Sequence, residues 1–364
     1  MKAAILRAPG APLEIETVSH ANPGFREVLV EVAATGLCHT DLHFMQGHLP
    51  VLMPAILGHE TAGVVLAVGA GVSAVTVGDH IVGCLSAFCG GCEFCLSGRP
   101  SICEGGDQLV RPVEEPTRLS ANGQPITQFM NLSAFAERIL VHENAIVKID
   151  KAMPLDRAAL IGCGVTTGFG AVVHTAKVQA GQSVAVIGCG AVGLSILQSA
   201  RIAGAMDVIA IDVNDARLET ARRFGATATI NPAGRDVVGE VRALTAGKGV
   251  HVAYEAVGAP KLVEQSFLMT RKGGTTVMVG LMSDGARIDL PFAPFIAERR
   301  LMGCDMGSNQ FRTDVPRLVR LYLDGRLNLD DMITARIPLA DINAGFETMK
   351  HGDGIRTVID FLTP

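Results

Sequence analysis

A glycine-rich turn between an apolar strand and an apolar helix constrains this chain more than any other feature. Residues 183–187 (SVAVI) are predicted to form a buried strand, and a G-x-G-x-x-G pattern at 188–193 opens a helical stretch directly after it. Apolar strands and helices then alternate between residues 165 and 305. Continuous apolar strands joined by helices are typical of a parallel sheet covered on both faces, so the sequence predicts a doubly wound α/β domain here.

Each part of this turn has a predicted role in binding a dinucleotide. Gly188 permits the tight turn, Gly190 lets backbone approach a pyrophosphate, and Gly193 lets the helix pack on the strand. The helix begins with Ala191 and Val192, and its free N–H groups and positive dipole end favour phosphates. The alternative interpretation is a glycine turn in an α/β domain that binds no nucleotide.

A carboxylate at the end of the next strand indicates which dinucleotide binds. Asp212 follows the strand DVIAI, 19 residues beyond Gly193. A carboxylate there can bind both ribose hydroxyls and would repel a 2′-phosphate. We therefore expect NAD as the cofactor, rather than NADP.

The sequence outside this region indicates a second, β-rich part. The first 150 residues contain short Val-rich and Ile-rich segments separated by Gly, Pro and Asn, which is typical of a β-dominated domain. Residues 104–130 are polar and contain three prolines, and we interpret them as a surface lobe. Near the C-terminus, two helices are predicted over 314–325 and 340–352 and a final strand over 356–362.

Composition and charge exclude several classes of function. The formal net charge is -5, aromatic residues make up 4% of the chain and Trp is absent, which argues against a nucleic-acid partner. Residues 61–78 and 178–200 carry no charge and are long enough to cross a bilayer, but their glycine and strand patterns predict buried parts of a sheet protein. The apolar run between Lys2 and Arg7 is too short for a signal peptide, so we expect a cytoplasmic protein without membrane contact.

Four of the nine cysteines are clustered with the spacing of a metal site. Without a secretory signal, clustered cysteines indicate metal binding rather than disulfides. Four thiolates within 15 residues predict a closed, structural zinc site, at Cys89, Cys92, Cys95 and Cys103. The alternatives are an iron–sulfur cluster and a nucleic-acid-binding zinc ribbon. The cluster region contains two acidic residues and one arginine, and this negative charge disfavours the ribbon: Glu93, Glu104 and Arg99. No role is assigned to Cys84, Cys189 or Cys304.

Three dispersed residues form a second candidate metal site. Cys38 lies in GLCHTDLH, His59 in GHE and Cys163 in IGCG. Taken singly, each is more often a buried cysteine or a hydrogen-bonded histidine than a ligand. Beside a dinucleotide motif, two thiolates and one imidazole leave a fourth position vacant, which is the open arrangement of a catalytic zinc.

These motifs together resemble the zinc-dependent medium-chain dehydrogenases, and among them the alcohol dehydrogenases with two zincs per subunit, whose known ligand set is two cysteines and one histidine. The resemblance runs through MKAAILRAPG, GLCHTDLH, PAILGHETAGVV, the cysteine cluster, LIGCGVTTGFGAVV and GIRTVIDF, and covers essentially the whole chain. It implies a catalytic domain with a GroES-like β core, residues 1–164 and 306–364, interrupted by a Rossmann domain at 165–305.

The resemblance also implies roles for individual residues. Cys38, His59 and Cys163 match the catalytic zinc ligands, and the four clustered cysteines match the structural zinc ligands. Other matches are the acidic neighbours of the catalytic zinc (Asp41 and Glu60), the proton relay (Thr40 and His43), the pyrophosphate contacts (His39 and Arg356), the ribose binder (Asp212) and a basic residue near the adenosine ribose (Arg217). His43 could also be a surface histidine without a role, and Glu60 either a plain neighbour or a transient ligand.

The implied activity is reversible hydride transfer between a primary alcohol and NAD. Zinc acts as a Lewis acid on the alcohol oxygen, and the proton leaves through the Thr40 hydroxyl and the cofactor ribose to His43. Two alternatives within the superfamily are an S-hydroxymethylglutathione (formaldehyde) dehydrogenase and an alcohol dehydrogenase with permanently bound NAD(H).

Alignment to the family predicts an apolar substrate pocket lined by Leu85, Phe129, Met130 and Leu281. Such walls suit aliphatic, allylic or aromatic primary alcohols and their aldehydes. The glutathione-dependent class carries acidic residues where this chain has residues 48–51 (HLPV). That class also has an arginine shortly after the position of Cys103, and in this chain Arg111 is the residue that could replace it.

We expect a homodimer joined through the last Rossmann strands, near 275–282 and 286–292, with a tetramer as the alternative.

Overall fold

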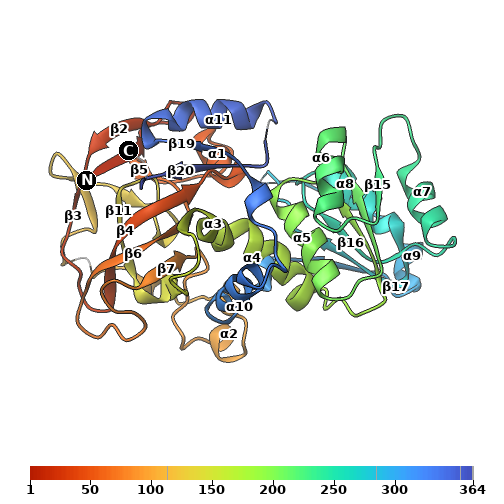
Figure 1. Ribbon diagram of the computed structural model, residues 1–364, viewed down its shortest axis with the longest axis horizontal. Coiled ribbons are helices and arrows are strands. Elements are labelled where there is room, and N and C mark those ends of the chain that lie inside the picture. The colour runs from red at the N-terminus through yellow and green to blue at the C-terminus, as the bar shows by residue number, and fades with distance from the viewer. Residues whose placement is uncertain (113, 284, 353, 363–364) are drawn as a thin grey trace. The chain divides into compact units, whose positions relative to one another are not determined.

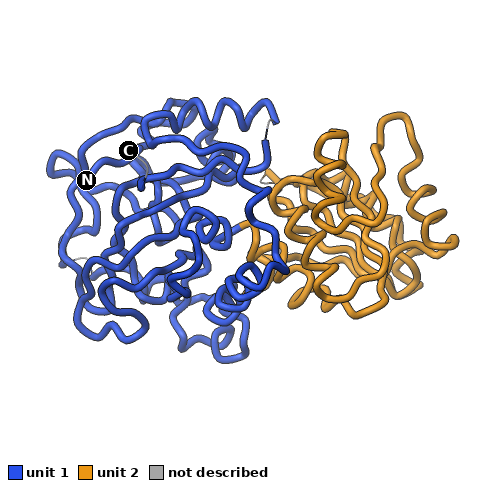
Figure 2. The backbone as a smooth tube through the Cα atoms, viewed as in Figure 1, with its two compact units in different colours: residues 1–163, 310–364 blue, residues 164–309 orange. Residues whose placement is uncertain are grey.

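The computed structural model describes residues 1–112, 114–283, 285–352 and 354–362 (Figure 1). The chain divides into two compact units (Figure 2). Unit 1 contains Met1–Cys163 and Gln310–Pro364, and unit 2 contains Gly164–Asn309. Unit 2 is therefore inserted into the sequence of unit 1.

Unit 1 is built from β-sheets, as its Val-rich and Ile-rich segments predict. A seven-stranded sheet has the order β12-β7-β6-β4-β20-β19, with β11 also paired to β4; a four-stranded sheet has the order β10-β5-β1-β2 and a three-stranded sheet β3-β8-β9. The strands are β1 (Lys2–Leu6), β2 (Glu14–Thr17), β3 (Ser19–His20), β4 (Glu27–Gly36), β5 (Ala55–Ile56), β6 (Glu60–Val68), β7 (His80–Gly83), β8 (Leu119–Ala121), β9 (Gln124–Pro125), β10 (Thr127–Gln128), β11 (Arg138–His142), β12 (Ile146–Lys148), β19 (Ile333–Ile337) and β20 (Arg356–Asp360).

Five α-helices accompany these sheets: α1 (His39–Met45), α2 (Glu93–Leu96), α3 (Leu155–Leu160), α10 (Phe311–Leu323) and α11 (Ile342–Lys350). The two helices and the final strand expected near the C-terminus are confirmed as α10, α11 and β20. Strand β19, which pairs in parallel with β20, is not predicted by the sequence.

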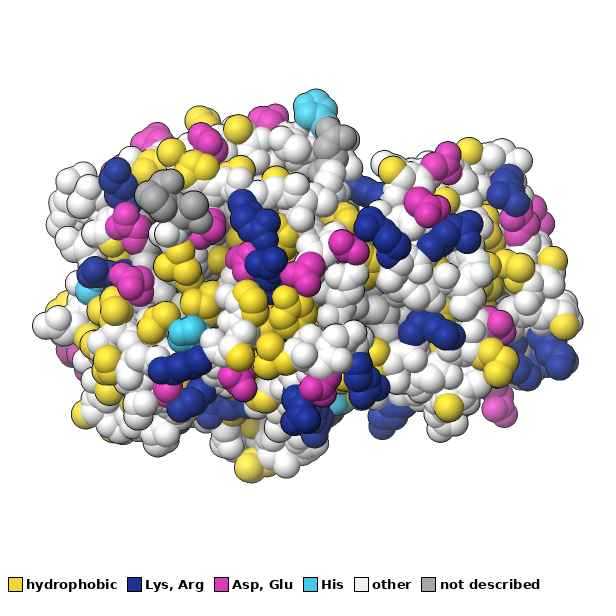
Figure 3. Space-filling view, in the orientation of Figure 1, with side chains coloured by type: hydrophobic (Ala, Val, Ile, Leu, Met, Phe, Trp, Pro, Cys, Tyr) yellow, Lys and Arg dark blue, Asp and Glu magenta, His cyan; other side chains and the backbone are white. Residues whose placement is uncertain are grey.

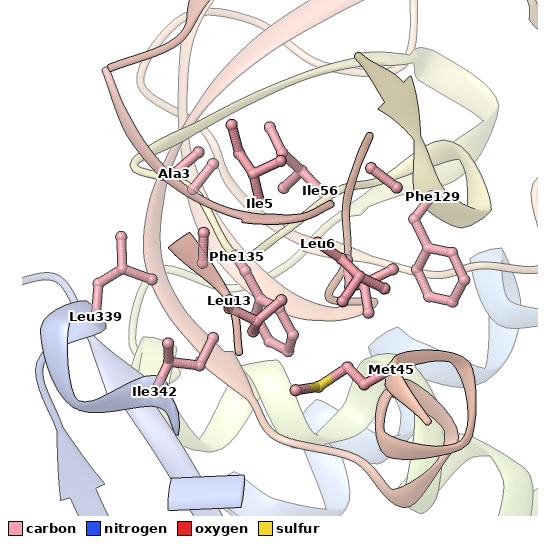
Figure 4. Close-up of a cluster of buried hydrophobic side chains, with 14 of the residues drawn as sticks. Ala3, Ile5, Leu6, Leu13, Met45, Ile56, Phe129, Phe135, Leu339 and Ile342 are labelled. Atoms are coloured by element: carbon pink, nitrogen blue, oxygen red, sulfur yellow. The ribbon is translucent and has the colours of Figure 1, made fainter. Parts of the chain in front are cut away.

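The lobe at residues 104–130 is less exposed than its polar sequence suggests. Leu119, Ile126 and Phe129 belong to a buried apolar cluster of unit 1, in which Phe129 lies beside Leu6 (Figure 4). The expectation of a surface lobe is therefore wrong for these residues, because apolar side chains at short-strand spacing anchor the segment to the core. Residue 113 of the lobe lies outside the described residues.

Unit 2 contains the predicted parallel sheet. Its six strands have the order β15-β14-β13-β16-β17-β18, and all neighbouring pairs are parallel. This order reverses between β13 and β16, which is the topological switch point where doubly wound sheets bind dinucleotides. The strands are β13 (Ser183–Ile187), β14 (Asp207–Ile211), β15 (Ala228–Ile230), β16 (Val250–Glu255), β17 (Thr270–Met278) and β18 (Arg300–Gly303). The helices are α4 (Thr166–Gly170), α5 (Ala191–Ile202), α6 (Asp215–Arg223), α7 (Val237–Leu244), α8 (Pro260–Met269) and α9 (Ala293–Ile296).

Of the two charge-free stretches, 178–200 is mostly buried, as expected, but in 61–78 the expectation of burial is wrong for the turn after β6, where Val77 is 62% exposed. Residues 61–78 contain most of β6 and the turn after it, and residues 178–200 contain β13 and most of α5. A third segment, the helical run Leu155–Thr175, is long and apolar enough to cross a membrane, but 89% of its most apolar window is buried inside the protein. Such burial is what a core helix shows.

Charged side chains of both signs are mixed on the surface. On the face shown in Figure 3, basic and acidic side chains are interspersed over unit 1 with apolar side chains between them. Several form exposed pairs within one helix, such as Arg320 with Asp324. Exposed pairs of this kind contribute at most about 1 kcal/mol to stability, so they favour solubility more than they define the fold.

Candidate metal and nucleotide sites

The dispersed metal ligands meet where β4 ends beside the start of β6. The register pairs Gly36 with Glu60, so Cys38, two residues beyond Gly36, lies close to His59. A Cβ at Gly36 would lie 2.3 Å from Glu60 Oε2, so a larger residue there would displace the Glu60 carboxylate. Cys163 comes from the helical run after α3, which packs against β4 and β6.

Cys38, His59, Glu60 and Cys163 form one buried cluster. Each offers one ligand atom, and these atoms all lie within 4.8 Å of one another. His59 Nδ1 lies 3.1 Å from Asp41 Oδ1, which also accepts the N–H of Gly58 at 3.0 Å. This contact directs His59 Nε2 into the cluster, where the described residues give it no hydrogen-bond partner although it is fully buried. An unpartnered buried nitrogen beside two sulfurs fits a metal ion.

The electrostatics of the cluster also favour a cation. Hydrogen bonding from Cys163 lowers the pKa of Cys38 well below its ordinary value despite burial, and the same contact raises the pKa of Cys163. Burial raises the pKa of Glu60 to about 8, although Arg356, with Nη2 3.2 Å from Oε1, opposes the shift. Two thiolates and one imidazole suit zinc, and three protein ligands leave a fourth position for substrate.

The four clustered cysteines surround a second metal position. Three of the sulfur–sulfur distances are 3.9 Å for Cys89–Cys95, 3.5 Å for Cys92–Cys95 and 3.8 Å for Cys92–Cys103. Four sulfurs bound tetrahedrally at a Zn–S distance of about 2.3 Å would lie about 3.8 Å apart. Backbone N–H groups also point at the sulfurs, from Cys92 to Cys89 at 3.3 Å and from Cys89 to Cys103 at 3.2 Å. The geometry fits the predicted structural zinc.

The glycine-rich turn lies at the switch point of unit 2. Gly193 must be glycine, because a Cβ there would lie 1.7 Å from the carbonyl oxygen of Gly188. Helix α5 has Gly190 as its N-cap and no side-chain cap, so its first N–H groups are available to an anion. Asp212, at the end of β14, accepts the N–H of Cys189 at 2.7 Å and that of Asn214 at 2.9 Å. The carboxylate is thus held beside the turn.

The remaining predicted residues are placed as follows. His39, Thr40 and His43 lie on α1, and His43 Nδ1 is 3.4 Å from His48 Nδ1. Arg217 is in the first turn of α6. Arg356 is buried, pairs with Glu60 and donates to the carbonyl of Leu37, so its guanidinium lies beside the ligands of unit 1.

Of the predicted pocket residues, Phe129 lies near the metal cluster. Its ring centroid is 6.1 Å from that of His59, in an edge-on arrangement, and 4.8 Å from that of Phe44. Leu85 and Met130 pack against the apolar clusters of unit 1, whereas Leu281 belongs to unit 2 and is 45% exposed.

Sequence reasoning misses a charged network at the start of β4. Glu27 accepts hydrogen bonds from Arg111 and Arg118, both in the 104–130 lobe. Burial alone would raise the pKa of Glu27, but the two arginines outweigh it and lower the pKa to about 2. The partners are 84 and 91 residues apart in sequence, so no local pattern indicates the pairing.

The comparisons with known proteins agree with this site. Residues 24–151 match the alcohol dehydrogenase GroES-like domain, and residues 191–323 match the zinc-binding dehydrogenase domain. An S-(hydroxymethyl)glutathione dehydrogenase of Escherichia coli O1:K1 / APEC is 40% identical over 367 residues, covering 99% of each chain.

Two solved structures are similar over almost the whole chain. An alcohol dehydrogenase zinc-binding domain protein from Burkholderia ambifaria has a TM-score of 0.94 at 38% identity, covering 99% of this chain and 98% of that one. Benzyl alcohol dehydrogenase from Acinetobacter calcoaceticus has a TM-score of 0.93 at 32% identity, with the same coverage. The chain belongs to the zinc-dependent medium-chain dehydrogenase family. It is an oxidoreductase of the zinc alcohol dehydrogenase type, with a GroES-like unit and a parallel-sheet unit.

Proposed function

We propose that this chain catalyses the NAD-dependent oxidation of primary alcohols that carry an apolar chain or ring, and the reverse reduction of their aldehydes. The observation that carries the proposal is the edge of Phe129 against His59, which puts an apolar wall beside the metal ligands. An apolar wall stabilises hydrocarbon groups and offers nothing to a charged substrate.

The chain's own residues supply the metal position and a proton path. Cys38, His59 and Cys163 would hold zinc, which when bound supplies a Lewis acid for an alcohol oxygen. Thr40 and His43 are three residues apart on α1 and so share one face of the helix. Burial, followed by the neighbouring His48, lowers the pKa of His43, so its imidazole is neutral and ready to accept a proton at neutral pH.

We expect a glutathione adduct to be a poorer substrate, and the contacts of Arg111 support this expectation. Arg111 is the residue that could take the place of the glutathione-binding arginine, but its side chain is only 10% exposed and is engaged with Glu27. It also donates to the carbonyls of Pro116 and Asn22. A guanidinium with these contacts is not available to a substrate carboxylate, and an unpaired carboxylate in a pocket is costly.

S-hydroxymethylglutathione oxidation is the second candidate, and the name of the 40% identical relatives favours it. Steady-state kinetics with NAD separates the two candidates, using benzyl alcohol, 1-octanol and S-hydroxymethylglutathione at one pH. We expect kcat/KM for the better simple alcohol to exceed that for the glutathione adduct by at least about tenfold. Cys38→Ala serves as the blank for metal-independent turnover. A preference for the glutathione adduct would overturn the proposal.

A further inference from the structure

A basic hollow lies in unit 2, at the end of the sheet opposite the glycine-rich turn. It has a volume of about 290 Å³, and its lining includes Lys177, His251, Arg271, Lys272 and Arg300. His251 is near the amino end of β16, Arg271 near that of β17, and Arg300 begins β18. In a parallel sheet the amino ends share one edge, whereas the glycine turn follows the carboxyl end of β13. The hollow is therefore separate from the nucleotide loop.

The protein offsets only part of the charge around this hollow: Asp207 raises the pKa of His251, but Asp207 does not line the hollow. No carboxylate is part of its lining. Among the described residues, none of its four lysine and arginine side chains forms an ion pair. Like charges gathered around one concave surface repel one another and raise the local concentration of anions. Such a surface attracts anions, and most strongly those with more than one negative charge.

An irregularity in β17 presents two of the cations. The register between β16 and β17 moves from Val250–Thr270 to Val252–Thr275, so β17 advances five residues while β16 advances two. The extra residues form a bulge that contains Arg271 and Lys272, and the N–H of Gly273 bonds the carbonyl of Ala297 at 2.9 Å. Bulges of this kind redirect side chains and are frequent beside binding sites.

The guanidinium of Arg271 is held in place by a histidine. Arg271 Nη1 lies 2.9 Å from His251 Nε2, and His251 Nδ1 lies 2.9 Å from Ser183 Oγ. The N–H of Ser183 also lies 3.0 Å from Nδ1, so contacts at both ring nitrogens fix the imidazole in place. Burial, followed by Arg271, lowers the pKa of His251, whereas Asp207 opposes the shift. A cation held in advance loses less side-chain entropy when it binds an anion.

We propose that this hollow binds a phosphoryl group, as inorganic phosphate or as a small phosphate monoester. A phosphoryl dianion matches several converging cations better than a single carboxylate does, and arginine binds it through paired N–H groups. The volume leaves room for a small organic group beside the phosphate. This site goes beyond the proposed function and does not depend on it.

Calorimetric titration of the zinc-loaded full chain tests the proposal, with the nucleotide site saturated by NAD and with low chloride at constant ionic strength. Inorganic phosphate and glycerol 3-phosphate are titrated separately. The test variant is Arg271→Gln/Lys272→Gln. The matched control, Arg320→Gln/Lys350→Gln, removes the same charge from surface positions of unit 1 where each cation has a carboxylate partner.

We expect one saturable site per chain in the unaltered protein and in the control, and at least about tenfold weaker binding in the test variant. Tighter binding of one ligand identifies the source of the phosphoryl group, and either result supports the site. If the double variant has an altered thermal unfolding midpoint, the single variant Lys272→Gln, at an exposed position, is used in its place. We expect its affinity for phosphate to be about threefold weaker than that of the unaltered protein. Equal affinity in all variants, or no saturable binding, would overturn the proposal.

Discussion

His59 Nδ1 lies 3.1 Å from Asp41 Oδ1, and both side chains are completely buried. Since neither side chain is exposed to solvent, the carboxylate fixes the ring orientation and keeps Nε2 aimed at the metal position. A ligand imidazole held in this way is a stronger ligand, because the carboxylate increases its basicity.

Asp41→Asn is therefore expected to weaken zinc binding at the Cys38/His59/Cys163 site by about 10–100-fold, because the amide orients His59 less firmly. Competition with a chromophoric chelator measures the affinity, and zinc analysis should show the four-cysteine site still loaded. Glu31→Gln, an exposed carboxylate on β4, is the control. Unchanged affinity in Asp41→Asn would show that the contact has no part in holding the metal.

The two metal sites should release zinc at different rates. The four-cysteine site is closed by four sulfurs and by N–H bonds, whereas the other leaves a position for an incoming ligand. Brief chelation should abolish activity, leave about one zinc per chain and keep the far-ultraviolet circular dichroism unchanged. Activity that survives loss of both metals would contradict the role given to zinc.

Substitution of single ligands should separate the two sites by their effect on folding. Cys38→Ala should be folded and inactive, because it removes a ligand of the open site. Cys92→Ala should unfold or aggregate, because a structural zinc contributes free energy of folding directly. Thermal unfolding and zinc content of the purified variants measure the difference, and a stable, zinc-depleted Cys92→Ala protein would argue against a structural role.

Cofactor choice should follow Asp212, whose carboxylate is held beside the glycine turn by two N–H groups. We expect kcat/KM for NAD to exceed that for NADP by at least about tenfold, or 1.4 kcal/mol. Asp212→Gly should lower the ratio of the two kcat/KM values, mainly because it weakens the binding of NAD. Equal use of both cofactors by the unaltered enzyme would refute the assignment.

The Glu27 network should make stability depend on acid. The folded pKa of Glu27 is about 2, and an unfolded glutamate titrates near about 4.3, a difference worth about 3 kcal/mol. A lowered folded pKa stabilises above the unfolded value, and this contribution disappears as the pH falls from about 4.3 to about 2. Glu27→Gln should thus be less stable than the unaltered protein at pH 7, with a gap that narrows at acid pH.

Urea unfolding of both proteins at several pH values measures this gap, and taking the difference cancels the zinc loss that both suffer in acid. Glu14→Gln, whose partner Arg7 is exposed, should leave stability nearly unchanged. If the difference in free energy of unfolding between the two proteins does not change with pH, the effect of Glu27→Gln comes from packing and not from the charge of Glu27.

The expected last strand at 286–292 is wrong, because these residues, all of which the structure describes, form no strand, and the edge strand of the unit 2 sheet is β18. We therefore expect assembly to occur at the free edge of β18. Phe292 and Ile296, just before this strand, are 75% and 72% exposed, and an apolar, unpaired edge favours pairing with a second copy. Light scattering should give twice 38.1 kDa, and Ile296→Glu should shift the protein toward a single chain. Four times that mass would favour the tetramer.

The features that the sequence predicts well are local ones. The glycine turn, the strand before it and the helix after it follow one another within 20 residues, and the four cysteines lie within 15. In both cases spacing alone places the side chains together. The dispersed site needed the family resemblance, because Cys38 and Cys163 meet only when the helix after residue 155 packs against β4 and β6.

Long-range contacts and irregular backbone could not be predicted. The pairing of Arg118 with Glu27 leaves no periodic signal, and it explains why a polar segment is partly buried. The bulge in β17 is likewise invisible, because a strand pattern does not show which residues lack a partner on the neighbouring strand.

The pairing of β20 with β4 has a consequence for how the protein is made. Val358 pairs with Gly36, and Arg356 is the cation beside Glu60. Because unit 2 is inserted between β4 and β20 in the sequence, a ribosome must translate all of unit 2 before β4 gains this neighbour. Until then, the nascent unit 1 has an open sheet edge at β4 and lacks the cation that lies beside Glu60. A chain that lacks β20 would keep both defects.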